Sequence, residues 1–381
     1  MEVPFYKHDI QPEDKERLLS ILDGPFLTTG NVTTTFEDKL GEAYGVKHAI
    51  GTTNWTSAAE LLLRLWEVGP GDEVIVPTMS YVASAHVVAL RGAKPVFIDS
   101  DRETGLLDLN ELEAKINSHT KVIMPVHLYG VMADMTVLRE LADKHGIRLF
   151  EDAAHAVIGS RDGVFPGQVG DAAALSFYAT KNITSGEGGA LLTNNDELAL
   201  RFRQGTSCGV TKTAYDRRRE GGAKYVGYDS TFPSGKCNMT NIQAALLEGQ
   251  LSRLKENRRH RAELVAHYRR ELATIPGIQL PVIPEGVESA HYTMVMLVIK
   301  GLRDKVFESF GREKIGCAIN FEPIHLRTFY KEQQGYREGD FPVAEDWGNR
   351  CVTLPLYPSL QPEQIDHIIS VLREEYLPLV G

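Results

Sequence analysis

The sequence lacks the features that mark several large classes of protein. Its four cysteines, Cys208, Cys237, Cys317 and Cys351, form no CxxC pair, which argues against a zinc knuckle or redox motif and favours free thiols in a reducing compartment. No apolar stretch reaches the ~20 residues that cross a bilayer, and the opening Met1–Phe5 has no basic region followed by an apolar run. No G-x-G-x-x-G motif follows a first strand, so nothing supports a generic Rossmann-like enzyme. We therefore expect a cytoplasmic protein without a metal, a signal peptide or a membrane span.

An excess of positive charge is also absent. The formal net charge is −10 over 381 residues, so binding to nucleic acid is not expected. The clusters Arg217–Arg219 and Arg258–Arg259 are local exceptions, and each is either solvated surface charge or part of a site. Hydrophobic residues make up 43% of the chain, which is ample for a large core, and the length indicates two to three domains at ~150 residues each.

Strand-like and helix-like patterns alternate from about residue 35 to residue 205. The apolar strand patterns cover residues 74–76, 95–99, 122–127, 148–152, 175–177 and 190–193, and amphipathic stretches such as Leu109–Ile116 and Met135–His145 lie between several of them. This order predicts an α/β fold with a mostly parallel sheet that helices cover on both faces. Such sheets bind ligands beyond the carboxyl ends of their strands.

The second half of the chain has a different pattern. Residues 206–240 are rich in Gly, Arg, Tyr and Lys, with little apolar periodicity, and a loop this long is usually functional or disordered. Asn241–Arg270 is predicted to be one long helix, and shorter strands and helices follow it. We predict an N-terminal segment over 1–35, a large domain over 36–240 that includes the loop, and a long helix with a small α/β domain over 241–381.

One lysine stands alone in the uncharged run Ser176–Gly186, between an apolar strand and a glycine-rich turn. Burial of a lysine favours its neutral amine, which attacks aldehydes. Lys181 is therefore either a nucleophile or a surface lysine at a strand end.

A carboxylate, Asp152, ends another apolar run, Arg148–Asp152. A lysine for an imine and a carboxylate for a pyridinium nitrogen are the two protein groups that pyridoxal phosphate most needs. Asp152 is alternatively an N-cap, because Ala153–Ala156 looks helical. His155 would share that helix face, either against a cofactor or as a hydrogen-bonded neighbour.

A phosphate needs backbone N–H groups and hydroxyls at a helix start. Gly51–Ala59 has small and hydroxylated residues before the helical pattern of Glu60–Leu65. Tyr81, after the strand that ends at Pro77, could lay its ring on a cofactor or be a core residue.

Taken in order, these residues resemble the DegT/DnrJ/EryC1/StrS family of sugar aminotransferases, which are fold-type I (aspartate aminotransferase-like) pyridoxal phosphate enzymes. The resemblance covers nearly the whole chain. It rests on Gly24–Gly30, Gly71–Pro77, Val126–Gly130, Glu151–His155 and Ser176–Gly189. One departure is Trp55, which stands where the family's phosphate segment usually has Gly. The resemblance implies a seven-stranded, mostly parallel sheet in a large cofactor-binding domain, with a smaller C-terminal α/β domain.

The resemblance also implies roles for single residues. Lys181 would form the imine with pyridoxal phosphate and later move a proton, and Asp152 would pair with the ring nitrogen. His155 and Tyr81 would lie against the cofactor ring. The phosphate would be held by Trp55 through its backbone, by Thr56 and Ser176, and by Asn238 of the neighbouring subunit. The family therefore implies a homodimer with shared active sites, in which the loop 206–240 serves the partner.

The expected substrate is a keto sugar linked to a nucleotide. Thr213–Arg219, together with Lys181–Thr184, looks most like the branch that aminates C4 of UDP-4-keto sugars for cell-surface polysaccharides. Arg217, Arg218 and Lys224 are candidates to neutralise the diphosphate, since Arg forms bidentate pairs with phosphate. The family places a sugar-site histidine at His325, and Tyr330 follows it. A dTDP-linked 3-keto or 4-keto sugar remains the alternative, and glutamate is the expected amino donor.

Two other function classes share this fold. Sugar dehydratases of the family carry histidine in place of the lysine, so Lys181 argues against that class. Non-catalytic sensors usually carry an added DNA-binding domain, which neither the acidic charge nor the N-terminus supports.

Overall fold

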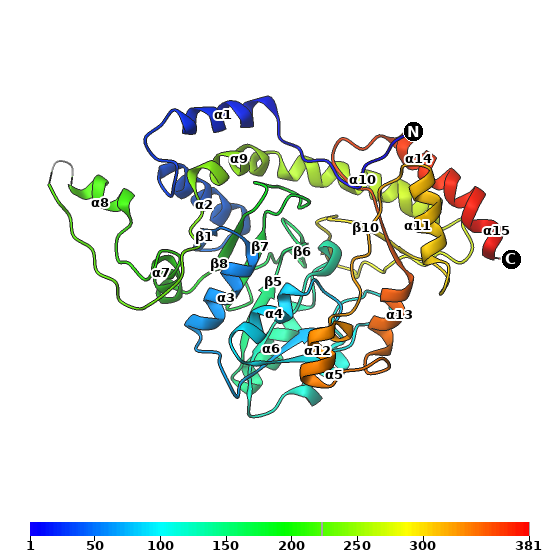
Figure 1. The fold of residues 1–381 in the computed structure, drawn as a ribbon, viewed down its shortest axis with the longest axis horizontal. Helices are drawn as coiled ribbons and strands as arrows, with labels where there is room; N and C mark the ends of the chain where they lie inside the picture. Colours follow the sequence, from blue (N-terminus) through cyan, green and yellow to red (C-terminus); the bar gives the residue numbers. More distant parts are fainter. Residues whose placement is uncertain (222–223, 381) are drawn as a thin grey trace.

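A seven-stranded sheet forms the centre of the computed structural model (Figure 1). The structure describes residues 1–221 and 224–380. Residues 222 and 223 of the predicted loop, and residue 381 of the predicted C-terminal domain, lie outside the described residues. In spatial order the strands are β1 (His48–Thr52), β8 (Gly189–Thr193), β7 (Ala172–Ser176), β5 (Arg148–Asp152), β4 (Thr120–Ile123), β2 (Glu73–Pro77) and β3 (Lys94–Ile98). Strand β8 runs antiparallel to both of its neighbours, and the other neighbouring pairs are parallel. The predicted α/β fold with a mostly parallel seven-stranded sheet is confirmed.

Both faces of the sheet are buried, which explains why its strands are apolar runs rather than alternating patterns. Val74 and Val76 belong to one buried cluster, whereas Ile75 between them belongs to another. The first cluster holds residues of α3 (Trp55–Leu65), α4 (Ala83–Leu90) and α7 (Asp196–Gly205). The second holds residues of α2 (Asn31–Tyr44), α5 (Leu109–Lys115), α6 (Met135–His145) and α9 (Asn241–Ser252).

The predicted long helix is two helices, α9 and α10 (Leu254–Leu272), which are separated by Arg253. The Arg253 guanidinium donates to Asp14 Oδ2 of α1 (Pro12–Leu22) at 2.6 Å and to the carbonyl oxygen of Asp9 at 3.0 Å. The break between the two helices therefore lies where Arg253 binds the N-terminal residues. Helix α1 lies along α9 (Figure 1).

A third buried cluster forms the core of the C-terminal region, between α10, α11 (Arg303–Arg312) and α14 (Pro362–Val371). Strands β10 (Met294–Leu297) and β11 (Cys351–Leu354) pair antiparallel beside it. Val3 joins this cluster through its bridge to Ile315. The remaining elements are β6 (Ser160–Arg161), β9 (Val287–Glu288), η1 (Leu128–Gly130), η2 (Ile324–Leu326), α12 (Thr328–Gln334), α13 (Pro342–Arg350), η3 (Leu372–Tyr376) and α15 (Leu377–Val380).

The segment 206–240 leaves the body of the molecule and returns to it, carrying a short helix, α8 (Ala214–Gly221), at its outer part (Figure 1). Bridges between Ser207 and Lys236, and between Val210 and Ser230, close its base. The segment is therefore a long loop whose two ends are fixed by these bridges. Its short helix was not predicted, because the sequence there has little apolar periodicity.

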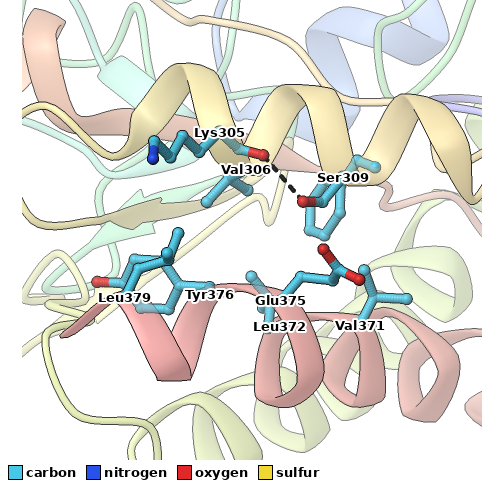
Figure 2. Close-up of a pocket in the computed structure, with 9 residues that line it drawn as sticks. Lys305, Val306, Ser309, Val371, Leu372, Glu375, Tyr376 and Leu379 are labelled. Atoms are coloured by element: carbon cyan, nitrogen blue, oxygen red, sulfur yellow. Dashed lines mark hydrogen bonds between the residues drawn. The ribbon is translucent and has the colours of Figure 1, made fainter. Parts of the chain in front are cut away.

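A narrow crevice lies between α11 and the C-terminal helices, where Ser309 Oγ donates to the carbonyl oxygen of Lys305 at 3.0 Å (Figure 2). Its volume of about 10 Å³ leaves room for roughly one water molecule.

Among the described helices, none is both long and apolar enough to cross a membrane.

Candidate active site

A cavity of about 630 Å³ lies at the carboxyl ends of β5 and β7 and the start of α3. Its wall contains seven of the predicted site residues: Trp55, Thr56, Tyr81, Asp152, His155, Ser176 and Lys181. Strands β5 and β7 are parallel neighbours, so the residues that end them, Asp152 and Ser176, reach the same edge of the sheet. This is the edge at which open α/β sheets bind their ligands.

Lys181 lies in the turn after β7, where its backbone N–H donates to the carbonyl oxygen of Tyr178 at 2.9 Å. The side chain is half-buried, and its Nζ lies 4.4 Å from the centre of the Tyr292 ring. Among the residues that the structure describes, it is the only Lys or Arg that lines this cavity.

Asp152 is buried at the end of β5 and accepts two hydrogen bonds. Ser84 Oγ donates to its Oδ2 at 2.8 Å, and the backbone N–H of Ala154 donates to its Oδ1 at 3.1 Å. Burial raises the pKa of the Asp152 carboxyl, and these hydrogen bonds and the charge of Lys181 oppose that rise. The alternative that Asp152 caps a helix is wrong, because no helix follows it and Ala153 N–H bonds to Ala174 of the sheet at 3.0 Å.

His155 is buried in a turn rather than on the expected helix face. Its Nδ1 accepts the backbone N–H of Tyr129 at 3.3 Å, so its proton is on Nε2. Burial, and then the charge of Lys181, hold the pKa of His155 well below its ordinary value. The ring is therefore neutral at physiological pH, and it stacks on Tyr292 with centres 4.3 Å apart.

The start of α3 could serve as a cradle for a phosphate. Asn54 caps the helix by accepting the backbone N–H of Ser57 at 2.8 Å, and the first turn of a helix presents backbone N–H groups to an anion. A Cβ on Gly189 would lie 2.7 Å from the backbone nitrogen of Trp55, so only glycine lets β8 begin this close to the cradle. The Trp55 ring packs against Phe150 in the core, with centres 6.3 Å apart. The large side chain is thus directed away from the cradle, and the site fits pyridoxal phosphate.

Asn238 and Arg217 line a second cavity, of about 320 Å³, at the base of the segment 206–240. Lys236 Nζ donates to Asn238 Oδ1 at 2.6 Å, and Asn238 Nδ2 donates to Thr29 Oγ1 at 2.6 Å. The Arg217 guanidinium lies 4.7 Å from the centre of the Tyr228 ring. Within one chain, the structure does not bring Asn238 into the wall of the first cavity.

Two more of the predicted substrate residues, Arg218 and Lys224, are placed outside both cavity walls. Arg218 lies over the ring of Phe26 at 5.3 Å from its centre, and Lys224 is exposed. Arg217 is therefore the member of the arginine cluster that is best placed to meet an anion.

His325 and Tyr330 are fully buried and line neither cavity. His325 Nδ1 bonds to Thr78 Oγ1 at 2.8 Å and its Nε2 to Glu345 Oε1 at 3.0 Å, so both ring nitrogens have partners. Tyr330 packs against Phe97 with ring centres 5.1 Å apart. The structure gives neither side chain access to a sugar, and we do not retain them as substrate contacts.

Among the residues that line these cavities and that the sequence did not single out are Ser84, Lys236, Tyr292 and Phe321. The signal for Lys236 was its place two residues before Asn238. The other three had no signal, because they reach the site from segments remote from the lysine and carboxylate motifs. In the part of the chain that the structure describes, no group of three or more His, Cys, Asp or Glu is arranged to hold a metal ion.

The fold and the site define a pyridoxal phosphate enzyme, and comparison with known proteins identifies its family. The model of the DegT/DnrJ/EryC1/StrS aminotransferase family matches residues 8–373. The spore coat polysaccharide biosynthesis protein SpsC of Bacillus subtilis is 35% identical over 377 residues, which cover 98% of this chain and 96% of SpsC.

Solved structures of two proteins are also similar, over 98% or more of each chain. Spr1654 of Streptococcus pneumoniae, a proposed sugar aminotransferase known in apo, PLP and PMP forms, is 30% identical in its PMP form, with a TM-score of 0.92 over 100% of each chain. S. venezuelae DesV, in complex with a ketimine intermediate, is 31% identical, with a TM-score of 0.90 over 98% of each chain.

This chain belongs to the DegT/DnrJ/EryC1/StrS aminotransferase family. It is a sugar aminotransferase, and its cofactor is pyridoxal phosphate. The family, fold and cofactor predicted from the sequence are confirmed.

Proposed function

We propose that this enzyme transfers the amino group of glutamate to C4 of a UDP-4-keto sugar. The observation that carries the nucleotide part is the second cavity, where Arg217 and Lys236 face a space without an Asp or Glu among its described lining residues. A diphosphate fits such a surface because guanidinium and ammonium groups bind phosphate oxygens strongly. The alternative substrates are dTDP-linked 3-keto or 4-keto sugars, which have the same diphosphate.

The residues of the first cavity have separate tasks in this proposal. When bound, pyridoxal phosphate supplies an aldehyde that carries the amino group and a ring that accepts electrons. The amine of Lys181 would hold the cofactor at its aldehyde, with loss of water, and when free it would carry the proton that the amino donor gives up. Asp152 holds a proton on the ring nitrogen, and the start of α3, with Thr56 and Ser176, binds the phosphate. His155 and Tyr81 would lie against the ring.

The active site is shared between two copies of the chain in our proposal. Among the described residues that line the first cavity, Lys181 is the only Lys or Arg, and it would be committed to the cofactor, yet the cavity must accept a phosphate and the carboxylates of glutamate. The second cavity is lined by Arg217 and Lys236, and its described lining residues include no carboxylate that could pair with a ring nitrogen. A homodimer that presents Asn238 to the partner's phosphate and Arg217 to the sugar diphosphate would combine the two sets of groups.

We further propose a place for the reaction in the cell. The free thiols suit a reducing cytoplasm, and the similarity to SpsC suggests a product that enters a cell-surface polysaccharide.

Incubation of the pyridoxamine form with a panel of UDP- and dTDP-linked keto sugars tests the proposal. Mass spectrometry should detect an amino sugar with a UDP-4-keto substrate, and Lys181→Ala should give none. Amination of dTDP sugars alone would support the alternative. Amination of no nucleotide sugar, by a protein that accepts amine from glutamate, would refute the nucleotide-linked substrate.

A further inference from the structure

Three consecutive residues of the lysine turn contact one short segment before β10. The Thr180 and Tyr292 hydroxyl oxygens lie 3.0 Å apart, and Asn182 Nδ2 donates to the carbonyl oxygen of Ala290 at 2.7 Å. Between these contacts, Lys181 Nζ lies 4.4 Å from the centre of the Tyr292 ring. The segment 290–292 therefore holds the turn on both sides of the reactive amine.

That segment is itself fixed at its backbone. Ala290 N–H donates to the carbonyl oxygen of Gly130 at 2.9 Å. The buried Arg261 donates to the carbonyl oxygens of His291 at 3.3 Å and of Leu356 at 3.0 Å. Tyr292 is only 7% exposed, so its ring has little freedom to leave the lysine.

We propose that Tyr292 is a positioning residue, which holds the Lys181 amine in reach of the reacting carbon whenever the lysine is not joined to the cofactor. This inference rests on the transaminase function proposed above. A cation within about 6 Å of an aromatic face is attracted by the ring quadrupole, and Lys181 Nζ meets that condition.

The held amine has a defined task. As a neutral amine, Lys181 would take the proton from Cα of the amino donor, while the bound cofactor would accept the electron pair of that C–H bond. Lys181 would then be an ammonium, the form that the Tyr292 ring attracts, until it gives the proton up again. An amine that swings away between these steps makes the proton transfer slower.

The first experiment compares the amino-acid half-reaction with glutamate and with glutamate deuterated at Cα. Tyr292→Leu removes the ring, so the half-reaction should slow about twofold to thirtyfold, the range that a lost cation–π contact spans. The primary isotope effect should rise, because proton transfer becomes more limiting. A wild-type rate and isotope effect in Tyr292→Leu would overturn the proposal.

Two smaller substitutions keep the proposal testable if Tyr292→Leu does not fold. Tyr292→Phe and Thr180→Val remove the same hydrogen bond from its two ends. Each should raise the isotope effect slightly and equally, and the double variant should match either single variant. Unequal or additive effects would show that the hydroxyl pair does not hold the ring over the lysine.

An NMR measurement on the cofactor-free protein separates this inference from the function itself. With lysine labelled at Cε, the Lys181 signal is the one that disappears in Lys181→Ala. It should lie upfield because of the Tyr292 ring. Tyr292→Leu should abolish that shift, and Tyr292→Phe should keep it. Absence of the shift in the wild type would overturn the contact. If the shift is present but wild-type enzyme accepts no amine from glutamate, the proposed donor fails and the positioning of Lys181 stands.

Discussion

Gly189 at the start of β8 lies against the backbone of Trp55 at the start of α3, so closely that a Cβ would stand 2.7 Å from the Trp55 nitrogen and 2.5 Å from the Asn54 carbonyl carbon. The glycine-rich motif after Lys181 thus lies against the helix start that we propose as the phosphate site. Any side chain at position 189 must push the start of the helix away.

Gly189→Ala should weaken pyridoxal phosphate binding. Overpacking of this kind costs about 1–3 kcal/mol, which corresponds to roughly five- to 150-fold in the dissociation constant if the whole cost falls on the cofactor site. Fluorescence titration of the cofactor-free protein measures it. Gly311→Ala is the control, because a Cβ there meets nothing within 4 Å, and equal affinity in both variants would show that the close approach does not shape the cradle.

Asp152→Asn should keep some cofactor but lose about 10²–10³-fold in rate, the scale for removing one such electrostatic contact. Single-turnover kinetics with glutamate measures this loss. Turnover near that of the wild type would mean that the carboxylate does not serve the ring nitrogen.

The raised pKa of Asp152 also predicts how cofactor affinity depends on pH. The ring nitrogen needs the ionised carboxylate, so affinity is complete above the raised pKa and falls as the pH drops through it. Because burial raises this pKa, the fall should begin above the ordinary value of ~3.9. Titrations from neutral to weakly acidic pH should show the fall in the wild type and lose most of it in Asp152→Asn.

His155→Gln should flatten the pH dependence of stability. The pKa of His155 is lowered in the folded protein, so the unfolded chain takes up the proton first. The neutral ring contributes its full share to the free energy of unfolding above pH ~6.5, the ordinary pKa of histidine. Below that pH the contribution falls by about 1.4 kcal/mol per pH unit. Denaturant unfolding of the cofactor-free protein at several pH values measures this slope, and an unchanged slope in the variant would contradict the assignment.

The sequence predicted those parts of the site that depend on local patterns and not those that depend on contacts between distant residues. The strands that end at Asp152 and Ser176 were visible as apolar runs, because a strand buried on both faces carries its own signal. The turn after Asp152 was not visible, because Ala153–Ala156 has high helix propensity. Two hydrogen bonds override that propensity: Ala153 N–H donates to Ala174, and Ala154 N–H donates to Asp152.

Contacts between distant segments account for most of the rest. Ser84 and Tyr292 reach Asp152 and Lys181 from positions 68 and 111 residues away in the chain, and no local pattern encodes such a pairing. His325 stood in a recognisable motif, yet packing directs its ring toward Thr78 and Glu345. The short strand β1, His48–Thr52, was also missed, because its glycine and small residues give a weak pattern.

Arg217→Gln should raise the KM for the nucleotide sugar about ten- to hundredfold, the scale of a lost charged hydrogen bond, while the glutamate half-reaction stays nearly intact. Arg219→Gln is the matched control, since Arg219 is exposed on the same helix and lines neither cavity. Steady-state kinetics at varied nucleotide sugar measures both variants. Equal effects of the two variants would indicate general screening rather than a specific contact.

Mixed dimers test the shared site. Lys181→Ala and Asn238→Ala subunits are each expected to be weakly active or inactive alone, but a heterodimer of the two should regain one complete site. Tagged heterodimers, purified in two affinity steps, provide the assay. Failure to regain activity would place Asn238 and Lys181 in the same subunit's site, or remove Asn238 from the site.

The measurement that tests the central claim most directly follows the amino nitrogen itself. The enzyme is incubated with glutamate labelled with ¹⁵N and a UDP-4-keto sugar, and the product is examined by mass spectrometry and NMR. We predict that the label appears on C4 of the sugar, and that Lys181→Ala transfers none. Label that remains in glutamate, with no labelled amino sugar from any nucleotide-linked ketone, would contradict the proposed function.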